Sequence, residues 1–233
     1  MSAHVSTIKA YKGMGMEGPV ARWYAGLTKK SMEDFKALAG RTAEQIPTHA
    51  SVLEVAPGPG YFAIELAKLG NFQITGLDIS DTFVQIARAN ALQAGVKVDF
   101  RKGNASSMPF PADSFDFLLC RAAFKNFSEP KRALQEFYRV LRPGGRALII
   151  DLRRDASMKD ISQAVTGMKL GTVNGLITRY TFRFMLLKRA YTKAEFEEMI
   201  SRTQFHGVEI HENSMGLEIL LSKNSKSVGF TYY

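Results

Sequence analysis

The amino-acid sequence predicts an α/β fold, with a mostly parallel sheet of seven strands, one antiparallel strand near the C-terminus and helices on both faces. Three observations support this prediction. Strand-like and helix-like segments alternate from residue 51 onward. The strand-like segments are apolar along nearly their whole length, which is typical of strands buried on both faces. The link between the last two permits a hairpin but is too short for a parallel crossover.

The first half of this core alternates strands with helices. We expect strands over residues 51–56, 72–78, 96–103 and 114–122, and helices over residues 60–70 and 80–95. Ser80 and Asp81 are both good N-cap residues for the second helix. Gly70 and Gly95 mark the points where the two helices end.

The second half adds two helices and three strands. We expect helices over residues 128–141 and 192–203, and strands over residues 146–152, 205–212 and 216–223. Ser128 is expected to open the first of these helices, with Pro130 in its first turn and the sequence RPGG at its end. Thr192 and Glu195 form a capping-box pattern at the start of the second helix.

Two segments lie outside this core, so we divide the chain into five parts. These are an N-terminal helical cap (1–50), a cofactor-binding core (51–152), a lid insertion (153–191), the C-terminal part of the core (192–223) and a tail (224–233). At least one helix is expected around residues 20–39. The insertion is far longer than an ordinary connection. We interpret it as a lid rather than plain scaffold, because it begins at the ligand-binding edge of the sheet.

Composition indicates a globular, cytoplasmic protein. The chain has 233 residues, of which 45% are hydrophobic and 23% charged. It has no apolar run of about 18 residues and no secretory signal pattern. Cys120 is the only cysteine, which suits a reducing compartment. The four histidines lack metal-ligand spacing, so we expect no metal site.

The chain carries a net charge of +9. Nucleic acid, an anionic membrane or an acidic ligand could account for this excess, and so could an ordinary basic surface. The basic residues are spread along the chain without a polybasic block, which favours the ordinary surface. We therefore expect neither nucleic acid nor a membrane to be required for activity.

A glycine-rich turn follows the first predicted strand, in the sequence VLEVAPGPGYF. Gly58 and Gly60 can adopt positive φ, whereas Pro57 and Pro59 fix their own φ and stiffen the turn. Ala56 stands where a first glycine is usual, and we expect it to keep an extended φ and only to allow close approach. Such a turn brings backbone N–H groups and a helix N-terminus to a ligand.

Asp78 ends the second predicted strand, where a carboxylate can accept hydrogen bonds from ribose hydroxyls. The loop alone does not choose the ligand, because Gly58, Gly60 and Ala63 also satisfy the dinucleotide fingerprint G-x-G-x-x-A. The turn could also bind no ligand and be a chance run of small residues beside an ordinary strand-end aspartate.

Four motifs in order decide between these readings. They are LEVAPGPG, GLDIS, GNASSMPFPADSFD and EFYRVLRPGGRALIID. Together they resemble the class I S-adenosylmethionine-dependent methyltransferases, and most closely the small-molecule branch that includes the ubiquinone- and menaquinone-type C-methyltransferases. The resemblance covers residues 50–153 strongly and 192–222 by topology. It implies a Rossmann-like fold, methyl transfer and S-adenosyl-L-methionine as cofactor.

By position in these motifs, the resemblance implies nine cofactor-binding residues: Glu54, Ala56, Gly58, Gly60, Asp78, Ile79, Asn104, Ala105 and Arg121. Glu54 is expected near the cofactor's amino group, the backbone of residues 56–60 near its methionine part, and Asp78 at its ribose hydroxyls. Ile79 would pack on adenine. Asn104 would address the adenine edge, although an aspartate is commoner there.

Four residues are candidates for orienting the methyl acceptor: Arg121, Lys125, Asn126 and Tyr24. The first three follow the fourth strand, beside the expected methyl-transfer position. They could orient an anionic or carbonyl-bearing acceptor, or they could bind only backbone carbonyls and solvent. A dedicated base is needed only for an acceptor that keeps its proton at working pH, so the catalytic residues stay unknown at this point.

The N-terminal aromatic residues allow two interpretations. Tyr11, Trp23 and Tyr24 could close over the cofactor or acceptor, or they could bury ordinary core under a capping helix. The segment over residues 176–191 mixes aromatic, apolar and basic residues. It could line an apolar acceptor pocket, rest on an anionic membrane, form a dimer face or be a buried lid helix.

The leading hypothesis is methyl transfer from S-adenosylmethionine to a small, partly apolar acceptor by in-line displacement. Methylation of a membrane-associated lipid or quinone-like acceptor is the alternative. A non-catalytic cofactor-binding or membrane-surface protein is the alternative of another class. The NPPF or DPPY tetrapeptide typical of nucleobase amine methylation is absent, so nucleic acid is not expected as a substrate. Peripheral membrane contact and a homodimer stay open.

Overall fold

A computed structural model describes residues 11–12, 15–167, 180, 184 and 186–224. Its centre is a seven-stranded sheet with the order β3-β2-β1-β4-β5-β7-β6. The strands are β1 (Ser51–Val55), β2 (Gln73–Asp78), β3 (Asp99–Lys102), β4 (Phe115–Arg121), β5 (Leu141–Leu152), β6 (Gly207–Glu212) and β7 (Gly216–Ser222). The principal helices are α1 (Gly18–Thr28), α2 (Met32–Ala43), α3 (Tyr61–Ala67), α4 (Asp81–Gln93), α5 (Pro130–Val140), α6 (Met158–Gly167) and α8 (Lys193–Ser201). Short 3-10 turns are η1 (Lys29–Ser31), η2 (Phe124–Asn126) and η4 (Leu187–Arg189).

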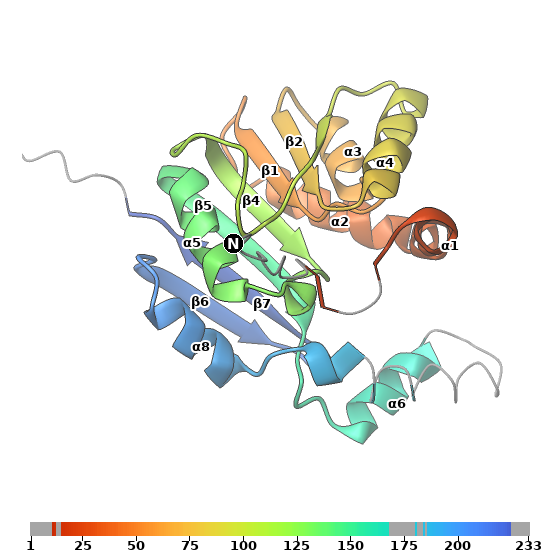
Figure 1. Ribbon diagram of the computed structural model, residues 1–233, viewed down its shortest axis with the longest axis vertical. Helices are drawn as coiled ribbons and strands as arrows, with labels where there is room; N and C mark the ends of the chain where they lie inside the picture. The colour runs from red at the N-terminus through yellow and green to blue at the C-terminus, as the bar shows by residue number, and fades with distance from the viewer. Residues whose placement is uncertain (1–10, 13–14, 168–179, 181–183, 185, 225–233) are drawn as a thin grey trace, which may run out of the picture.

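The strand directions confirm the predicted fold class. Strands β1 to β5 pair in parallel, whereas β7 is antiparallel to both β5 and β6. Strand β7 is therefore the one antiparallel strand that the short link predicted. It lies between β5 and β6, so the hairpin continues the sheet rather than leaving it (Figure 1).

Helices cover both faces of the sheet (Figure 1), and an apolar layer lies between the helices and the sheet on each face. Alternate residues of the central strands point to opposite layers, so Leu53 packs with α5 and α8 while Val52 packs with α2, α3 and α4. The same alternation separates Ile149 from Leu148 on β5. Burial on both faces explains why these strands are apolar throughout.

The capping box predicted for α8 is confirmed. The Thr192 hydroxyl accepts a hydrogen bond from the Glu195 backbone N–H at 3.3 Å, and the Glu195 carboxylate accepts one from the Thr192 N–H at 2.8 Å. This exchange satisfies two backbone donors that a helix start otherwise leaves unpaired.

Two boundary predictions were wrong. Helix α5 begins after Glu129, not Ser128, and the Ser128 hydroxyl has no hydrogen-bond partner in the described chain. Strand β5 begins at Leu141, because the RPGG segment pairs with its neighbours instead of forming a loop. The prediction of at least one helix around residues 20–39 is confirmed by α1 and α2, which η1 joins. Among the described helices, none is both long and apolar enough to cross a membrane.

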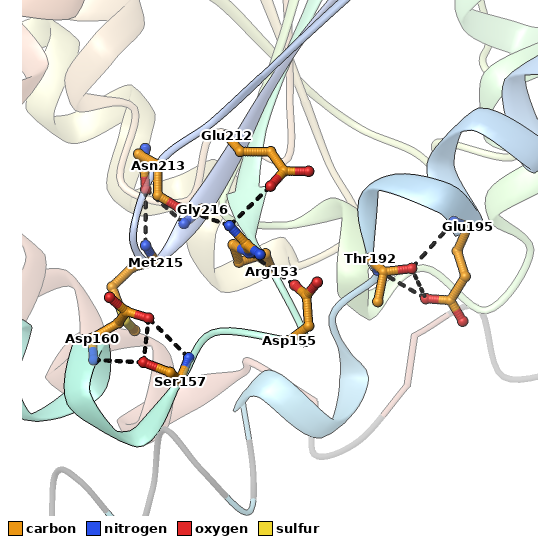
Figure 2. A network of polar contacts seen from close by, with 10 residues as sticks. All are labelled: Arg153, Asp155, Ser157, Asp160, Thr192, Glu195, Glu212, Asn213, Met215 and Gly216. Carbon is orange, nitrogen blue, oxygen red and sulfur yellow. Dashed lines mark hydrogen bonds and ion pairs between the residues drawn. The ribbon is translucent and has the colours of Figure 1, made fainter.

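The two ends of the 153–191 insertion lie side by side at the end of β5 (Figure 2). Arg153 and Tyr191 form a parallel bridge, and the Arg154 N–H donates to the Tyr191 carbonyl at 3.2 Å. The Arg153 guanidinium also bridges Asp155 and Glu212, at 2.8 and 3.0 Å. The base of the insertion is thus fixed to the β6–β7 hairpin. Half of the 176–191 segment lies outside the described residues, so its interpretations stay predictions.

Candidate active site

The carboxyl ends of the parallel strands form the candidate site. Glu54 lies near the end of β1, Asp78 ends β2, Arg121 ends β4 and Asp151 lies near the end of β5. Parallel strands place these ends on one edge, beside the point where the strand order reverses between β1 and β4. Ligands of open α/β sheets bind at this edge.

The loop between β1 and α3 turns through three residues with positive φ. These are Ala56 at 56°, Gly58 at 55° and Gly60 at 78°. The expectation of an extended φ at Ala56 was wrong. Its N–H donates to the Leu77 carbonyl of β2 at 2.8 Å, and this anchor holds the alanine in the left-handed region.

The two glycines differ in what surrounds them. A Cβ on Gly60 would lie 2.6 Å from Cζ of Phe100, so this glycine is needed for packing of the loop against the core. A Cβ on Gly58 would meet no atom within 4 Å. The backbone at Gly58 therefore has an open side that a ligand can approach.

The strain at Ala56 leads to a stability prediction. Ala56→Gly is expected to raise the free energy of unfolding by about 0.5–1 kcal/mol, because relief of about 1–2 kcal/mol of left-handed strain exceeds the added flexibility of the unfolded chain. Urea denaturation measures the change. Ala63→Gly, the same substitution within α3, is the control and should destabilise the protein. A decrease in stability for Ala56→Gly would contradict the strain.

Asp78 is buried and fixes the loop to β2. Its carboxylate accepts hydrogen bonds from the N–H groups of Gly58 and Ser80, both at 2.9 Å. Burial raises the pKa of Asp78 to about 6, against the lowering effect of these hydrogen bonds. The next residue, Ile79, is 38% exposed. An exposed apolar side chain beside a buried carboxylate suits a ligand with both hydroxyl groups and a flat ring.

Glu54 is the second buried carboxylate of the site. It is 3% exposed and accepts a hydrogen bond from the Ala63 N–H, in α3, at 3.1 Å. Burial raises the pKa of Glu54 to about 8, while Arg121 lies near enough to oppose this rise. A carboxylate held in this way gains from a cationic ligand group, which would favour its ionised form.

Residues 103–105, which were predicted to lie at the adenine end of the cofactor, form a turn beside β2. The Gly103 N–H donates to the Asp78 carbonyl at 2.8 Å, which ties this turn to β2. The Asn104 side-chain oxygen accepts from the Ser106 N–H at 2.9 Å, and Ala105 is buried. The Asn104 oxygen is thus used to shape the turn, and its NH₂ group is the part suited to contact a ligand.

Arg121 and two tyrosines lie close to the carboxylates. The Arg121 guanidinium stacks over the Phe35 ring, 4.6 Å from its centroid. Burial raises the pKa of Tyr24, and the nearby Arg121 charge opposes this. Burial also raises the pKa of Tyr11; the Arg189 charge opposes this rise, and the Asp78 charge adds to it. Within the described chain, the Arg121 guanidinium makes no hydrogen bond, so its N–H groups can donate to a bound substrate.

Of the two roles considered for Lys125, its contacts in the structure favour the binding of backbone carbonyls. Its ammonium group donates to Asp151 at 2.9 Å and to the Ala122 carbonyl at 2.5 Å, and the residue is 5% exposed. This buried pair leaves little of Lys125 for contact with an acceptor. The neighbouring Asn126 is half-buried, and its carbonyl accepts from the Lys12 N–H at 2.7 Å.

Sequence reasoning missed two residues that shape the candidate site, Asp151 and Phe35. Asp151 holds the turn after β4, and the signal for it was the same as for Asp78: an acidic residue at the end of an apolar strand. Phe35 stacks on Arg121 from α2, and no local pattern indicates that contact. Trp23 is 67% exposed, so it does not bury ordinary core, and its closure over a ligand stays a prediction.

The residues present fit S-adenosylmethionine. Asp78 offers a fixed carboxylate for ribose hydroxyls, Glu54 offers one for an ammonium group, and the open side of Gly58 lies between β1 and α3. Ile79 supplies an exposed apolar surface for a base. Fold and site together are those of an α/β protein suited to a nucleoside cofactor at a topological switch point.

Comparison with known proteins identifies the family. Residues 53–149 match the family described as "Methyltransferase domain". A demethylmenaquinone methyltransferase of Chlorobaculum tepidum is 30% identical over 175 residues, which cover 72% of this chain and 71% of that protein. The chain belongs to the class I S-adenosylmethionine-dependent methyltransferases, in the branch of the ubiquinone- and menaquinone-type enzymes, and its cofactor is S-adenosyl-L-methionine.

Other relatives align over less of their length. A demethylmenaquinone methyltransferase of Deinococcus radiodurans is 37% identical over 107 residues, covering 46% of this chain and 44% of that protein. The chain thus matches under half the length of this relative. Among solved structures, a protein of Methanococcus maripaludis has a TM-score of 0.74 at 20% identity, covering 93% of this chain and 98% of its own. This likeness confirms the fold.

Proposed function

We propose that this protein transfers the methyl group of S-adenosylmethionine to a small, partly apolar acceptor with a quinone-like ring. The observation that carries the proposal is the cluster of Glu54, Asp78 and Arg121 at one sheet edge, with Tyr24 beside it. The names of the curated relatives, which act on demethylmenaquinone, favour a quinone-like ring over other small acceptors.

The cofactor supplies a methyl group already activated on a sulfonium, so the protein's main task is alignment and exclusion of water. Asp78 would hold the nucleoside end, the backbone around Gly58 the methionine part, and Glu54 the amino group. Arg121 would orient the acceptor through one of its oxygens, so that the acceptor's nucleophilic atom faces the methyl group of the cofactor. Tyr11 and Tyr24 shield this space from solvent.

The test combines binding with turnover. Calorimetry should show binding of S-adenosylmethionine and S-adenosylhomocysteine but not of NAD. Transfer of labelled methyl should occur to short-chain naphthoquinols and not to RNA or DNA. Binding of NAD without binding of S-adenosylmethionine would overturn the cofactor assignment. Methylation of nucleic acid, or of amines in place of quinols, would contradict the proposed quinone-like acceptor.

Asp78→Ala tests the nucleoside contact. Cofactor affinity should fall by roughly 1–3 kcal/mol, equivalent to about 5- to 150-fold in Kd, because ribose hydroxyls lose their buried partner. Calorimetry measures Kd, and urea denaturation checks that the variant stays folded. Asp81→Ala, which removes an exposed carboxylate three residues along, is the control and should leave Kd near the original value. An unchanged Kd for Asp78→Ala would limit Asp78 to a structural role.

A further inference from the structure

The outward face of α1 and η1 carries an apolar pair among basic residues. Trp23 is 67% exposed and Leu27, one turn further along, is 46% exposed. Arg22, Lys29 and Lys30 are also exposed. Tryptophan is rarely left in water in this way, since it buries more apolar area than most side chains. We call these five residues the α1 face.

The orientation of this helix is fixed, so the α1 face cannot turn inward. Ala21 and Ala25 on the opposite side are buried, at 0% and 7% exposure. The Tyr61 hydroxyl donates to the Ala25 carbonyl at 3.0 Å, which ties α1 to the start of α3. The Glu17 carboxylate, just before α1, accepts from the Asp81 and Thr82 N–H groups of α4, both at 3.0 Å.

The charge of the α1 face is positive, and the nearest acidic residues along the chain, Glu17, Glu33 and Asp34, lie beyond its two ends. Within the described chain, Arg22, Lys29 and Lys30 take part in no ion pair. Residues 18–31 include no acidic side chain. Glu33, in the first turn of α2, is already paired with Lys36 at 2.8 Å. A surface that meets the α1 face therefore has to carry negative charge.

We propose that the α1 face docks on the surface of an anionic lipid bilayer. Trp23 and Leu27 would enter the headgroup region, while Arg22, Lys29 and Lys30 would meet lipid phosphates. A bilayer suits the α1 face better than a protein does. A stable protein interface needs about 800 Å² from each partner, which is more than the five residues of this face supply. Nucleic acid would leave Leu27 without a partner.

Docking would give the protein a location and not a catalytic group. Tyr24 lies on the same helix but turns toward Arg121, so docking would hold the acceptor side of the site near the membrane. The inference rests on the exposure and charge of α1. It does not depend on the identity of the acceptor, and vesicle binding tests it without any turnover.

Trp23 is the only tryptophan of the chain, so its emission reports on this face alone. In the protein without lipid, emission should be that of a solvent-exposed indole and acrylamide should quench it readily. Vesicles of phosphatidylglycerol and phosphatidylcholine should shift emission to the blue and protect it from quenching. Vesicles of phosphatidylcholine alone should not. Blue-shifted emission without lipid would show that another segment or a second copy covers the face, and would overturn the proposal.

Matched variants assign the binding to this face. Lys29→Glu with Lys30→Glu should weaken cosedimentation with anionic vesicles at least about tenfold, and high salt should do the same to the original protein. Lys97→Glu with Lys131→Glu, exposed elsewhere, changes the net charge equally and should weaken it much less. Leu27→Ser should likewise weaken binding more than Leu92→Ser, since Leu92 is 84% exposed on α4. Absence of vesicle binding, or equal losses in the paired variants, would overturn the proposal.

Discussion

The Glu54→Gln variant is expected to lose most of the pH dependence of stability that the cofactor-free protein shows above about pH 5. In the original protein, Glu54 should lower the free energy of unfolding by roughly 4 kcal/mol between about pH 5 and pH 8.5. Urea denaturation across this range measures both proteins. Glu44→Gln, an exposed change at the end of α2, is the control for the substitution itself.

The sign follows from burial. Glu54 has a pKa near 8 when folded, against 4.5 as its ordinary value, so the folded protein holds a proton that the unfolded chain releases. Its contribution to stability is complete below about pH 4.5 and is lost as pH rises through the folded pKa. Asp78, with a pKa of about 6, adds a smaller loss in the lower part of the range. Parallel pH profiles for the two proteins would contradict this account.

The proposed contact with the cofactor adds a second readout. Near neutral pH the Glu54 carboxyl is mostly protonated without ligand, and a cationic amino group beside it favours ionisation. Cofactor binding should therefore release protons, and calorimetric enthalpies should vary with the ionisation enthalpy of the buffer. This variation should disappear in Glu54→Gln.

Asp151→Ala is expected to lower the free energy of unfolding by about 3–5 kcal/mol. The Asp151 carboxylate accepts from the N–H and the ammonium group of Lys125 and from the Leu152 N–H, at 2.8 to 2.9 Å. Both charged residues are 5% exposed. Removal of the carboxylate leaves a buried ammonium group with the Ala122 carbonyl as its remaining partner.

Two further variants separate this cost from general damage. Lys125→Met combined with Asp151→Leu removes both charges and should recover much of the lost stability. Asp155→Ala removes an exposed carboxylate that pairs with Arg153, and should cost up to about 1 kcal/mol. Denaturation midpoints measure all three. Equal losses for Asp151→Ala and Asp155→Ala would show that the buried pair contributes no more than a surface one.

The sequence was sufficient for the elements that carry a local signal. Apolar strands that alternate with helices predicted the sheet. The short link predicted the antiparallel β7, and the Thr192 pattern predicted the capping box. The loop after β1 and the strand-end Asp78 were found for the same reason. In each case the chemistry of a few neighbouring residues decides the conformation.

Other features depend on contacts that are distant in the sequence. Ala56 adopts positive φ because β2 anchors its N–H, and an alanine alone gives no sign of that. The burial of Lys125 depends on Asp151, 26 residues further along. The exposure of Trp23 depends on which side of α1 meets α4. Local propensity cannot supply these facts.

The adjoining ends of the 153–191 insertion have an evolutionary consequence. Because Arg153 and Tyr191 are bridged, the two ends of this segment stay next to each other at the end of β5. Segments attached in this way can be exchanged between relatives while the cofactor half stays intact. A chimera that keeps the bridged ends and takes the intervening residues from another family member should therefore fold and bind the same cofactor. Acceptor choice could diversify through such exchange while cofactor use stays constant.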